Sequence, residues 1–268
     1  MYTDYNIGFI GAGKMALALA TGLSRHINPD QIYAFSPSGK TFCSWKDIGA
    51  RCSTDPSSLA VCNILVIAVK PHMFDVAIRP FTGWNKPLFV SVMAGLSIKH
   101  ISSVVSSNRI VRIMTNTASA FGCACSVYAP SEKIGAGDDS TIQWFLNCVG
   151  SCEIISESNI NGFTALAGSG PAYIYTILEG LADGGVLVGL SRAEATKFAA
   201  QMTMGAARVA LESGKHTGQL KDAVTSPAGT TMSGIQVLEK GGIRGVLIDA
   251  VQASANRAAE LSGQGKNL

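Results

Sequence analysis

Two turns in this chain carry residue types that could do chemistry, and the first reads Gly11-Ala12-Gly13-Lys14-Met15. It follows a short apolar run at residues 7–10 and opens an apolar, helix-like run. Gly11 permits a tight turn, and Gly13 has no Cβ, so a pyrophosphate can approach the backbone amides at the helix start. Glycine turns between strands and helices are also common where no ligand binds. The turn predicts a dinucleotide site, with an ordinary strand–helix connection as the alternative.

The second turn, at residues 224–232, reads Val-Thr-Ser-Pro-Ala-Gly-Thr-Thr-Met. It combines hydroxyl groups, small residues and the backbone N–H groups of a predicted helix start. Such a segment can bind a small carboxylate without a charged side chain. A hydroxyl-rich helix cap accounts for the same residues, so both interpretations stay open at this point. A third turn, at residues 167–173, is rich in glycine and opens a long apolar helix.

Apolar runs in the first half of the chain predict strands that alternate with helices. The clearest run, residues 63–69, is typical of a parallel strand covered on both faces. It stops at Lys70, which therefore lies at the carboxyl edge of the sheet, where open α/β folds bind ligands; a surface lysine is the alternative. Other strands are predicted at residues 7–10, 31–35, 88–92, 109–114, 126–128 and 152–155. This alternation predicts the α/β class, with an N-terminal Rossmann-type doubly wound sheet.

The pattern changes after residue 158, and no convincing strand follows. Ser191 with Glu194 forms a predicted capping box at the start of a helix that runs to about Ser213. Other helices are predicted at residues 172–190, 219–224, 231–239 and 243–261. We therefore predict a nucleotide-binding domain at residues 1–158 and an all-helical dimerisation and substrate-binding domain at residues 159–268. Because these helices are apolar around much of their circumference, a homodimer through this domain is expected.

The strand at residues 31–35 ends in a segment that bears on cofactor choice. An NAD site usually places an acidic residue here to bond the ribose hydroxyls. This chain has Ser36 and Ser38 with Lys40 close by, a set that suits the 2′-phosphate of NADP. A polar turn without a ligand explains the same residues.

Composition narrows the class of protein. The chain has 268 residues, is 47% hydrophobic and has a formal net charge of only +3, which argues against a nucleic-acid partner. No uninterrupted apolar run is long enough to span a bilayer, and no signal or transit peptide is recognised ahead of the first strand, so a cytoplasmic location is expected. The odd number of cysteines, seven, is interpreted as buried free thiols in a reducing compartment. Four scattered histidines make a metal site unexpected.

Six segments of the chain together form a recognisable pattern. They are Gly8-Phe9-Ile10-Gly11-Ala12-Gly13-Lys14-Met15-Ala16, Ala68-Val69-Lys70-Pro71, Arg112-Ile113-Met114-Thr115-Asn116-Thr117, Gly168-Ser169-Gly170-Pro171-Ala172-Tyr173, Ser226-Pro227-Ala228-Gly229-Thr230-Thr231 and Arg257-Ala258-Ala259-Glu260-Leu261. Through these segments, and along essentially its whole length, the chain resembles the Δ1-pyrroline-5-carboxylate reductase family. The resemblance implies reduction of Δ1-pyrroline-5-carboxylate to L-proline with NADPH or NADH, in proline biosynthesis. It also implies an obligate dimer of interlocked helical domains, often assembled further.

The resemblance also implies roles for individual residues. The amides of Gly229 and Thr230 are expected to bind the substrate carboxylate, the hydroxyl of Thr231 to bond the ring nitrogen, and Ser226 to complete the substrate site. The reaction needs neither a nucleophile nor a metal. A site between the sheet edge and the helical domain is expected. The predicted cofactor residues are Gly11, Gly13, Lys14, Met15, Ser36, Ser38, Asp55, Ala68, Val69, Lys70, Pro71, Ala94, Gly95 and Asn116.

Several positions depart from the family pattern. Ala228 stands where glycine is usual, Asn161 where aspartate is usual, and Cys123 where glutamate is usual. Asp55 stands where an asparagine often lies close to the adenosine ribose, and its charge opposes a 2′-phosphate, so the cofactor is NADP or NAD with a slight lean to NADP. Two alternative functions stay open: a reductase of a related cyclic imino acid, and a catalytically weak NAD(P)-binding regulatory protein.

Overall fold

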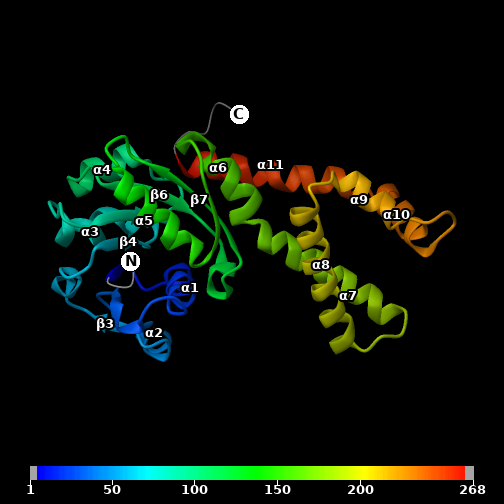
Figure 1. Cartoon of the computed structure of the whole chain (residues 1–268), viewed down its shortest axis with the longest axis horizontal. Helices are drawn as coiled ribbons and strands as arrows, with labels where there is room; N and C mark the ends of the chain where they lie inside the picture. The colour runs from blue at the N-terminus through cyan, green and yellow to red at the C-terminus, as the bar shows by residue number, and fades with distance from the viewer. Residues whose placement is uncertain (1–4, 263–268) are drawn as a thin grey trace. The chain divides into compact units, whose positions relative to one another are not determined.

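The computed structural model describes residues 5–262 of the chain, which divides into two compact units (Figure 1). Unit 1 comprises Met1–Ser169 together with Ser254–Leu268, and unit 2 comprises Gly170–Ala253. The predicted cofactor residues all lie in unit 1, and the predicted substrate residues all lie in unit 2. The functional boundary after residue 158 remains a prediction.

Unit 1 is built on one eight-stranded sheet with the order β3-β2-β1-β4-β5-β6-β7-β8. Neighbouring strands are parallel except β6 and β7, which pair antiparallel. The chain moves outward from β1 to β3 and then continues on the other side of β1 with β4, so the switch point lies between β1 and β4. The strands are β1 (Ile7–Ile10), β2 (Ile32–Phe35), β3 (Arg51–Ser53), β4 (Ile64–Ile67), β5 (Leu88–Ser91), β6 (Ile110–Met114), β7 (Ala124–Pro130) and β8 (Gly150–Ile154).

Helices cover both faces of this sheet because successive strand residues point to opposite sides. Phe9 and Val66 belong to a core shared with α1 (Lys14–Leu23), α2 (Phe42–Asp47) and α5 (Ala136–Asn147). Ile10 and Leu65, the adjacent residues, belong to a second core shared with α3 (Phe74–Ile78) and α4 (Ile98–Val105). The predicted doubly wound α/β class is confirmed, and Figure 1 shows these helices around the strands.

Several short elements of unit 1 were not predicted. Strand β3 has only three residues, Arg-Cys-Ser, and therefore lacks an apolar run that would mark it. The short helices α2, α3 and α6 (Ile160–Phe163) are only four to six residues long, too short for a helical period. Single 3₁₀ turns lie at Pro29–Gln31, Pro56–Leu59, Pro71–Met73, Arg79–Phe81, Thr117–Phe121 and Glu157–Asn159, and a π-helical turn lies at Thr164–Gly168.

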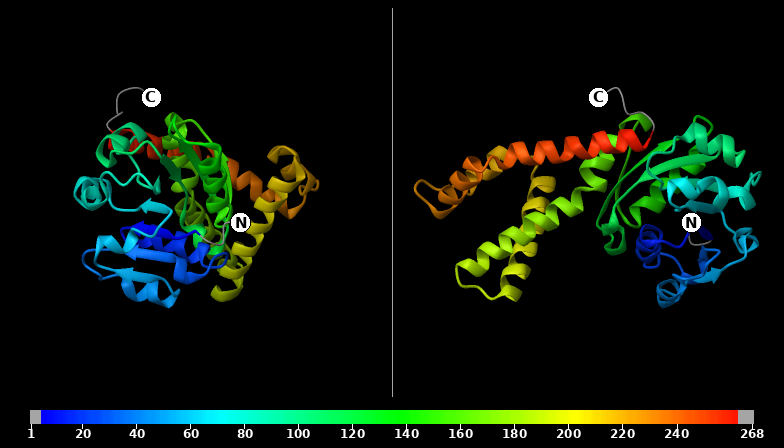
Figure 2. Two further views of the ribbon diagram at one scale, coloured as in Figure 1. Left: turned by 60° about the vertical axis from the view of Figure 1, so that its left-hand side comes forward. Right: turned by 180° about the vertical axis from the view of Figure 1, so that it is seen from behind.

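Unit 2 consists of helices, as predicted. They are α7 (Gly170–Leu187), α8 (Arg192–Ser213), α9 (Thr217–Ala223), α10 (Thr230–Lys240) and α11 (Ile243–Leu261), the last of which continues into unit 1. Figure 2 shows α7 and α8 side by side as a hairpin. The predicted capping box is present: Glu194 N donates to Ser191 Oγ over 3.3 Å, and Ser191 N donates to Glu194 Oε2 over 3.1 Å. Helix α7 ends before its predicted limit because Gly189 turns left-handed, with φ +101°.

The helices of unit 2 leave large apolar side chains uncovered. Leu187 is 88% exposed, Val188 79% and Leu211 85%. An apolar groove of about 460 Å³ lies between α7, α10 and α11, with Ile177, Leu238 and Val246 in its lining. Within the described residues, none of the helices is both long enough and apolar enough to cross a lipid bilayer.

The cysteines differ from expectation. They are free thiols, as predicted, but only Cys62 and Cys148 are buried, whereas Cys43, Cys123 and Cys125 are exposed. The expectation of mostly buried thiols is therefore wrong, because apolar neighbours in sequence do not prevent a side chain from facing outward. Burial raises the pKa of Cys62 to about 12 and that of Cys148 to about 11.

Candidate active site

The glycine turn after β1 touches the loop after β4 at the switch point of the sheet. Gly11 has φ +97°, and a Cβ placed on it would lie 2.8 Å from both the Ala68 carbonyl oxygen and Val69 Cγ1. Ala68 N donates to the Ile10 carbonyl over 2.9 Å, which ties the two loops together. Only glycine suits this position, both for its backbone angle and for its close neighbours. Lys70 and Pro71 follow directly and are exposed at the same edge.

The start of α1 has the properties of an anion site. Gly13 is the N-cap residue and supplies no side-chain cap, and a Cβ built on it meets no atom within 4 Å. The first bond of the helix is from Leu17 N to the Gly13 carbonyl, over 2.9 Å. No acceptor is recorded within residues 5–262 for the amides of Lys14, Met15 and Ala16. Three unpaired amides beside open space fit a pyrophosphate.

The residues predicted to determine the preference for NADP or NAD lie at one edge of the sheet, after the ends of β2 and β3. Ser36 N donates to the Ser53 carbonyl over 3.3 Å, and the Ser36 and Ser38 hydroxyls lie 3.5 Å apart. Asp55 caps the next 3₁₀ turn: its carboxylate accepts from Ser57 Oγ (2.6 Å) and Ser57 N (2.9 Å). These two hydrogen bonds hold the pKa of Asp55 below its ordinary value. A carboxylate charge therefore stands at this edge together with the serine hydroxyls.

The ends of β5 and β6 are held by packing within unit 1. Gly95 has φ +82°, and a Cβ on it would lie 2.9 Å from the Leu261 carbonyl oxygen, so the Ala94-Gly95 turn packs on the end of α11. The Asn116 amide is already engaged: its Oδ1 accepts from Ala118 N (3.1 Å), and its Nδ2 donates to the Ala167 carbonyl (3.0 Å). The described contacts of Asn116 are structural, and its cofactor role remains a prediction.

The start of α10 also has unpaired amides. Gly229 is the N-cap residue, and a Cβ there would collide with Ser226 Oγ. Gly229 N donates to the Ser226 carbonyl over 3.1 Å, so this amide is already bonded. Among the described residues no acceptor is recorded for the amides of Thr230, Thr231 and Met232. The carboxylate role expected of Gly229 and Thr230 remains a prediction.

Ala228, which precedes this helix, has φ +54°, a left-handed angle that disfavours side chains with a Cβ. Ala228→Gly is expected to stabilise the fold by about 0.5–1 kcal/mol, since glycine adopts this angle without strain. Chemical denaturation of both proteins measures the difference. The control is Gly13→Ala, at a residue with an ordinary φ (–79°), and it should not raise the free energy of unfolding. A less stable Ala228→Gly protein would contradict the strain.

Sequence reasoning missed one further feature of unit 1. Arg112 lies inside the apolar strand β6 with its side chain only 6% exposed, and its Nη1 donates to Glu157 Oε1 over 3.2 Å. A charged residue within the run Ile-Val-Arg-Ile-Met is the signal that could have identified it. Over residues 5–262, no group of three or more His, Cys, Asp and Glu side chains is arranged to hold a metal ion.

Comparison with known proteins places this chain among its relatives. It is 42% identical to the pyrroline-5-carboxylate reductase of Pisum sativum over 274 aligned residues, covering 97% of each chain. This chain belongs to the pyrroline-5-carboxylate reductase family. The Escherichia coli member is 35% identical over 97% of this chain and 99% of its own.

Solved structures of pyrroline-5-carboxylate reductases cover both units, and two family models match parts of the chain. The enzyme from Coxiella burnetii superposes with a TM-score of 0.85 at 33% identity, over 96% of this chain and 98% of its own. The Plasmodium falciparum enzyme, solved with NADP bound, superposes with a TM-score of 0.84 at 28% identity, over 98% of this chain and 99% of its own. The pyrroline-5-carboxylate reductase dimerisation model matches residues 157–261, and the coenzyme F420-dependent NADP oxidoreductase model matches residues 6–95. The predicted substrate residues fall within the first match, whereas Asn116 lies outside both.

Proposed function

We propose that this member of the family reduces Δ1-pyrroline-5-carboxylate to L-proline with NADPH or NADH. The observation that carries the proposal is the start of α10, where the unpaired amides of Thr230, Thr231 and Met232 stand beside two threonine hydroxyls. Such a terminus suits a substrate that has a carboxylate next to a ring nitrogen. The relatives named above all carry this reductase name, and no specific observation favours either alternative function.

The chemistry follows from the substrate, a cyclic imine whose protonated form accepts a hydride at C5. When bound, the dinucleotide supplies that hydride. The amides of Thr230, Thr231 and Met232 bind the carboxylate, and the Thr231 hydroxyl accepts a hydrogen bond from the protonated ring nitrogen. These contacts fix the face and the distance of the imine carbon, which is the main contribution that a hydride-transfer enzyme makes.

The dinucleotide would be held by the carboxyl edge of the sheet. The amides of Lys14, Met15 and Ala16 are available for its pyrophosphate. In this proposal Ser36, Ser38 and Asp55 face the adenosine ribose, while Ala68, Val69, Lys70 and Pro71 flank the cofactor. Ala94, Gly95 and Asn116 line the nicotinamide pocket, and Ser226 supports the loop that binds the substrate.

The test follows NADPH and NADH oxidation with Δ1-pyrroline-5-carboxylate. Turnover that releases L-proline supports the proposal. Turnover only with a six-membered cyclic imino acid would instead identify the related reductase. Tight cofactor binding without oxidation of any imine would identify the regulatory binding protein.

Asp55 is expected to set the choice between the two cofactors. Its carboxylate is ionised near neutral pH, because two hydrogen bonds from Ser57 lower its pKa. Asp55→Asn should raise the ratio of kcat/KM for NADPH over NADH by about 3- to 10-fold, since one charge that repels the 2′-phosphate is removed. Asp30→Asn, an exposed change elsewhere in unit 1, is the control. An unchanged ratio would show that Asp55 does not face the ribose.

We further propose a homodimer, or a higher homo-oligomer, assembled through the helical domain. The exposed apolar side chains of α7 and α8, such as Leu187 and Leu211, support this proposal, as does the dimerisation model that matches residues 157–261. Light scattering at micromolar concentration is expected to give at least twice the monomer mass. A monomer at that concentration would contradict the assembly.

We also propose a cytoplasmic location, which the free thiols support.

A further inference from the structure

Arg112 in unit 1 has one edge that nothing in the described structure satisfies. Its neighbours Val111 and Ile113 belong to the core on the opposite face of the sheet, so Arg112 points to the face that carries α4. Nη1 donates to Glu157 Oε1, but Nε and Nη2 are buried and have no hydrogen-bond partner in the described chain. Buried donors in folded proteins are nearly always paired, so an unpaired guanidinium edge needs an explanation.

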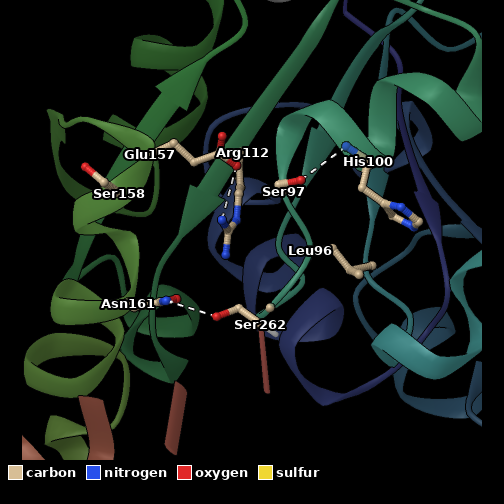
Figure 3. A pocket seen from close by; sticks show the side chains of 9 residues that line it. Leu96, Ser97, His100, Arg112, Glu157, Ser158, Asn161 and Ser262 are labelled. Carbon is tan, nitrogen blue, oxygen red and sulfur yellow. Dashed lines mark hydrogen bonds and ion pairs between the residues drawn. The ribbon is translucent and has the colours of Figure 1, made fainter. Parts of the chain in front are cut away.

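A cavity of about 540 Å³ adjoins this side chain, with Ser97, Glu157, Asn161 and Ser262 also in its lining. In Figure 3 the guanidinium of Arg112 points toward the hydrogen bond that joins Asn161 and Ser262. The cavity is several times the volume that one water molecule occupies in the liquid, about 30 Å³. It therefore has room for a small ligand together with bound water.

Among residues 5–262, the charged side chains around this cavity leave the Nε–Nη2 edge of Arg112 without a counter-ion. Glu157 is the carboxylate in the described lining, and its Oε1 is shared between Arg112 Nη1 (3.2 Å) and Ile98 N (2.7 Å) at the start of α4. Asn161 presents a neutral amide, whose Nδ2 donates to Ser262 Oγ over 3.1 Å. His100 is also in the lining, and its Nε2 lies 3.8 Å from Asp75 Oδ1. The carboxylate in the described lining thus pairs with Nη1 of Arg112 and leaves Nε and Nη2 without a partner.

We propose that this cavity binds a small oxyanion, a carboxylate or a phosphate group, on the Nε–Nη2 edge of Arg112. These two nitrogens carry parallel N–H bonds on one side of the planar guanidinium, a spacing that matches two oxygens of either group. Burial lowers the pKa of Arg112, and a bound anion would offset that effect. The cavity lining includes Gly95 of the proposed nicotinamide pocket, but no described residue from the start of α1 or from the start of α10.

The experiment measures thermal unfolding of the full chain saturated with NADP, so that the predicted pyrophosphate site is filled. Inorganic phosphate and, separately, acetate are titrated at constant ionic strength. Asn161→Asp places a second carboxylate beside Arg112 and is expected to raise the half-saturating anion concentration at least about tenfold. Ser262→Ala removes the hydrogen bond from Asn161 without adding charge, and it should leave that concentration within about twofold.

Location is tested by anomalous diffraction from crystals soaked in selenate, which should give a peak within hydrogen-bond distance of Arg112 Nε or Nη2. A stronger response to phosphate would identify a phosphate ligand, and a stronger response to acetate a carboxylate ligand. Arg112→Lys should abolish this selenate peak, and Asn161→Asp keeps the test decisive if Arg112→Lys does not fold. Equal responses of the natural protein and Asn161→Asp, or selenate bound only at the starts of α1 and α10, would overturn the proposal.

Discussion

Thr231→Ala is expected to lower kcat/KM for Δ1-pyrroline-5-carboxylate by about 100- to 1,000-fold while the Kd for NADPH stays unchanged. Thr231 is the second residue of α10 and is exposed. In the proposed mechanism its hydroxyl accepts a hydrogen bond from the protonated ring nitrogen and so holds the imine in position for hydride transfer. Steady-state kinetics with both substrates, together with fluorescence titration of NADPH, measures the two effects separately.

Two further variants test whether the loss comes from the hydroxyl group. Thr231→Ser keeps the hydroxyl and should recover most of the activity. Thr196→Ala removes an exposed threonine of α8, whose hydroxyl donates to the Arg192 carbonyl, and should leave kcat/KM unchanged. Unchanged turnover in Thr231→Ala would refute the role given to this residue.

Gly11→Ala and Gly13→Ala are expected to differ in their effect on stability, although the two glycines are only two residues apart. At Gly11, with φ +97°, the new methyl group would meet the Ala68 carbonyl oxygen and Val69 Cγ1 at 2.8 Å. We expect this variant to lose about 2–4 kcal/mol of unfolding free energy. Gly13 has an ordinary φ and open space around it, so its variant should unfold within about 0.5 kcal/mol of the natural protein.

The cofactor measurement separates the two glycines further. A methyl group at Gly13 would occupy the space that a pyrophosphate needs, so Gly13→Ala should raise the Kd for NADPH at least about tenfold without unfolding the protein. Isothermal titration calorimetry with NADPH measures this change. Normal NADPH affinity in Gly13→Ala would show that the pyrophosphate does not approach α1 here.

Much of the fold follows from local patterns in the sequence. The run at residues 63–69 predicts a covered parallel strand, observed as β4, because burial on both faces requires a continuous apolar segment. The capping box at Ser191 and Glu194 is confirmed because both residues belong to one helix turn. Strand β3 could not be predicted: pairing with β2 supports it, and its own three residues carry no signal.

The candidate site likewise combines features that the sequence shows with features that only the fold shows. The glycine turn, the threonine loop and the departure at Ala228 are visible in the sequence, because each depends on a few consecutive residues. Three facts emerge only from the folded chain. Gly11 touches Ala68, the Asn116 side-chain amide donates to the Ala167 carbonyl, and Arg112 is buried with two unpaired nitrogens. These facts arise from contacts between residues far apart in sequence. Local residue patterns specify turns and helix starts, whereas packing decides which polar atoms remain available for a ligand.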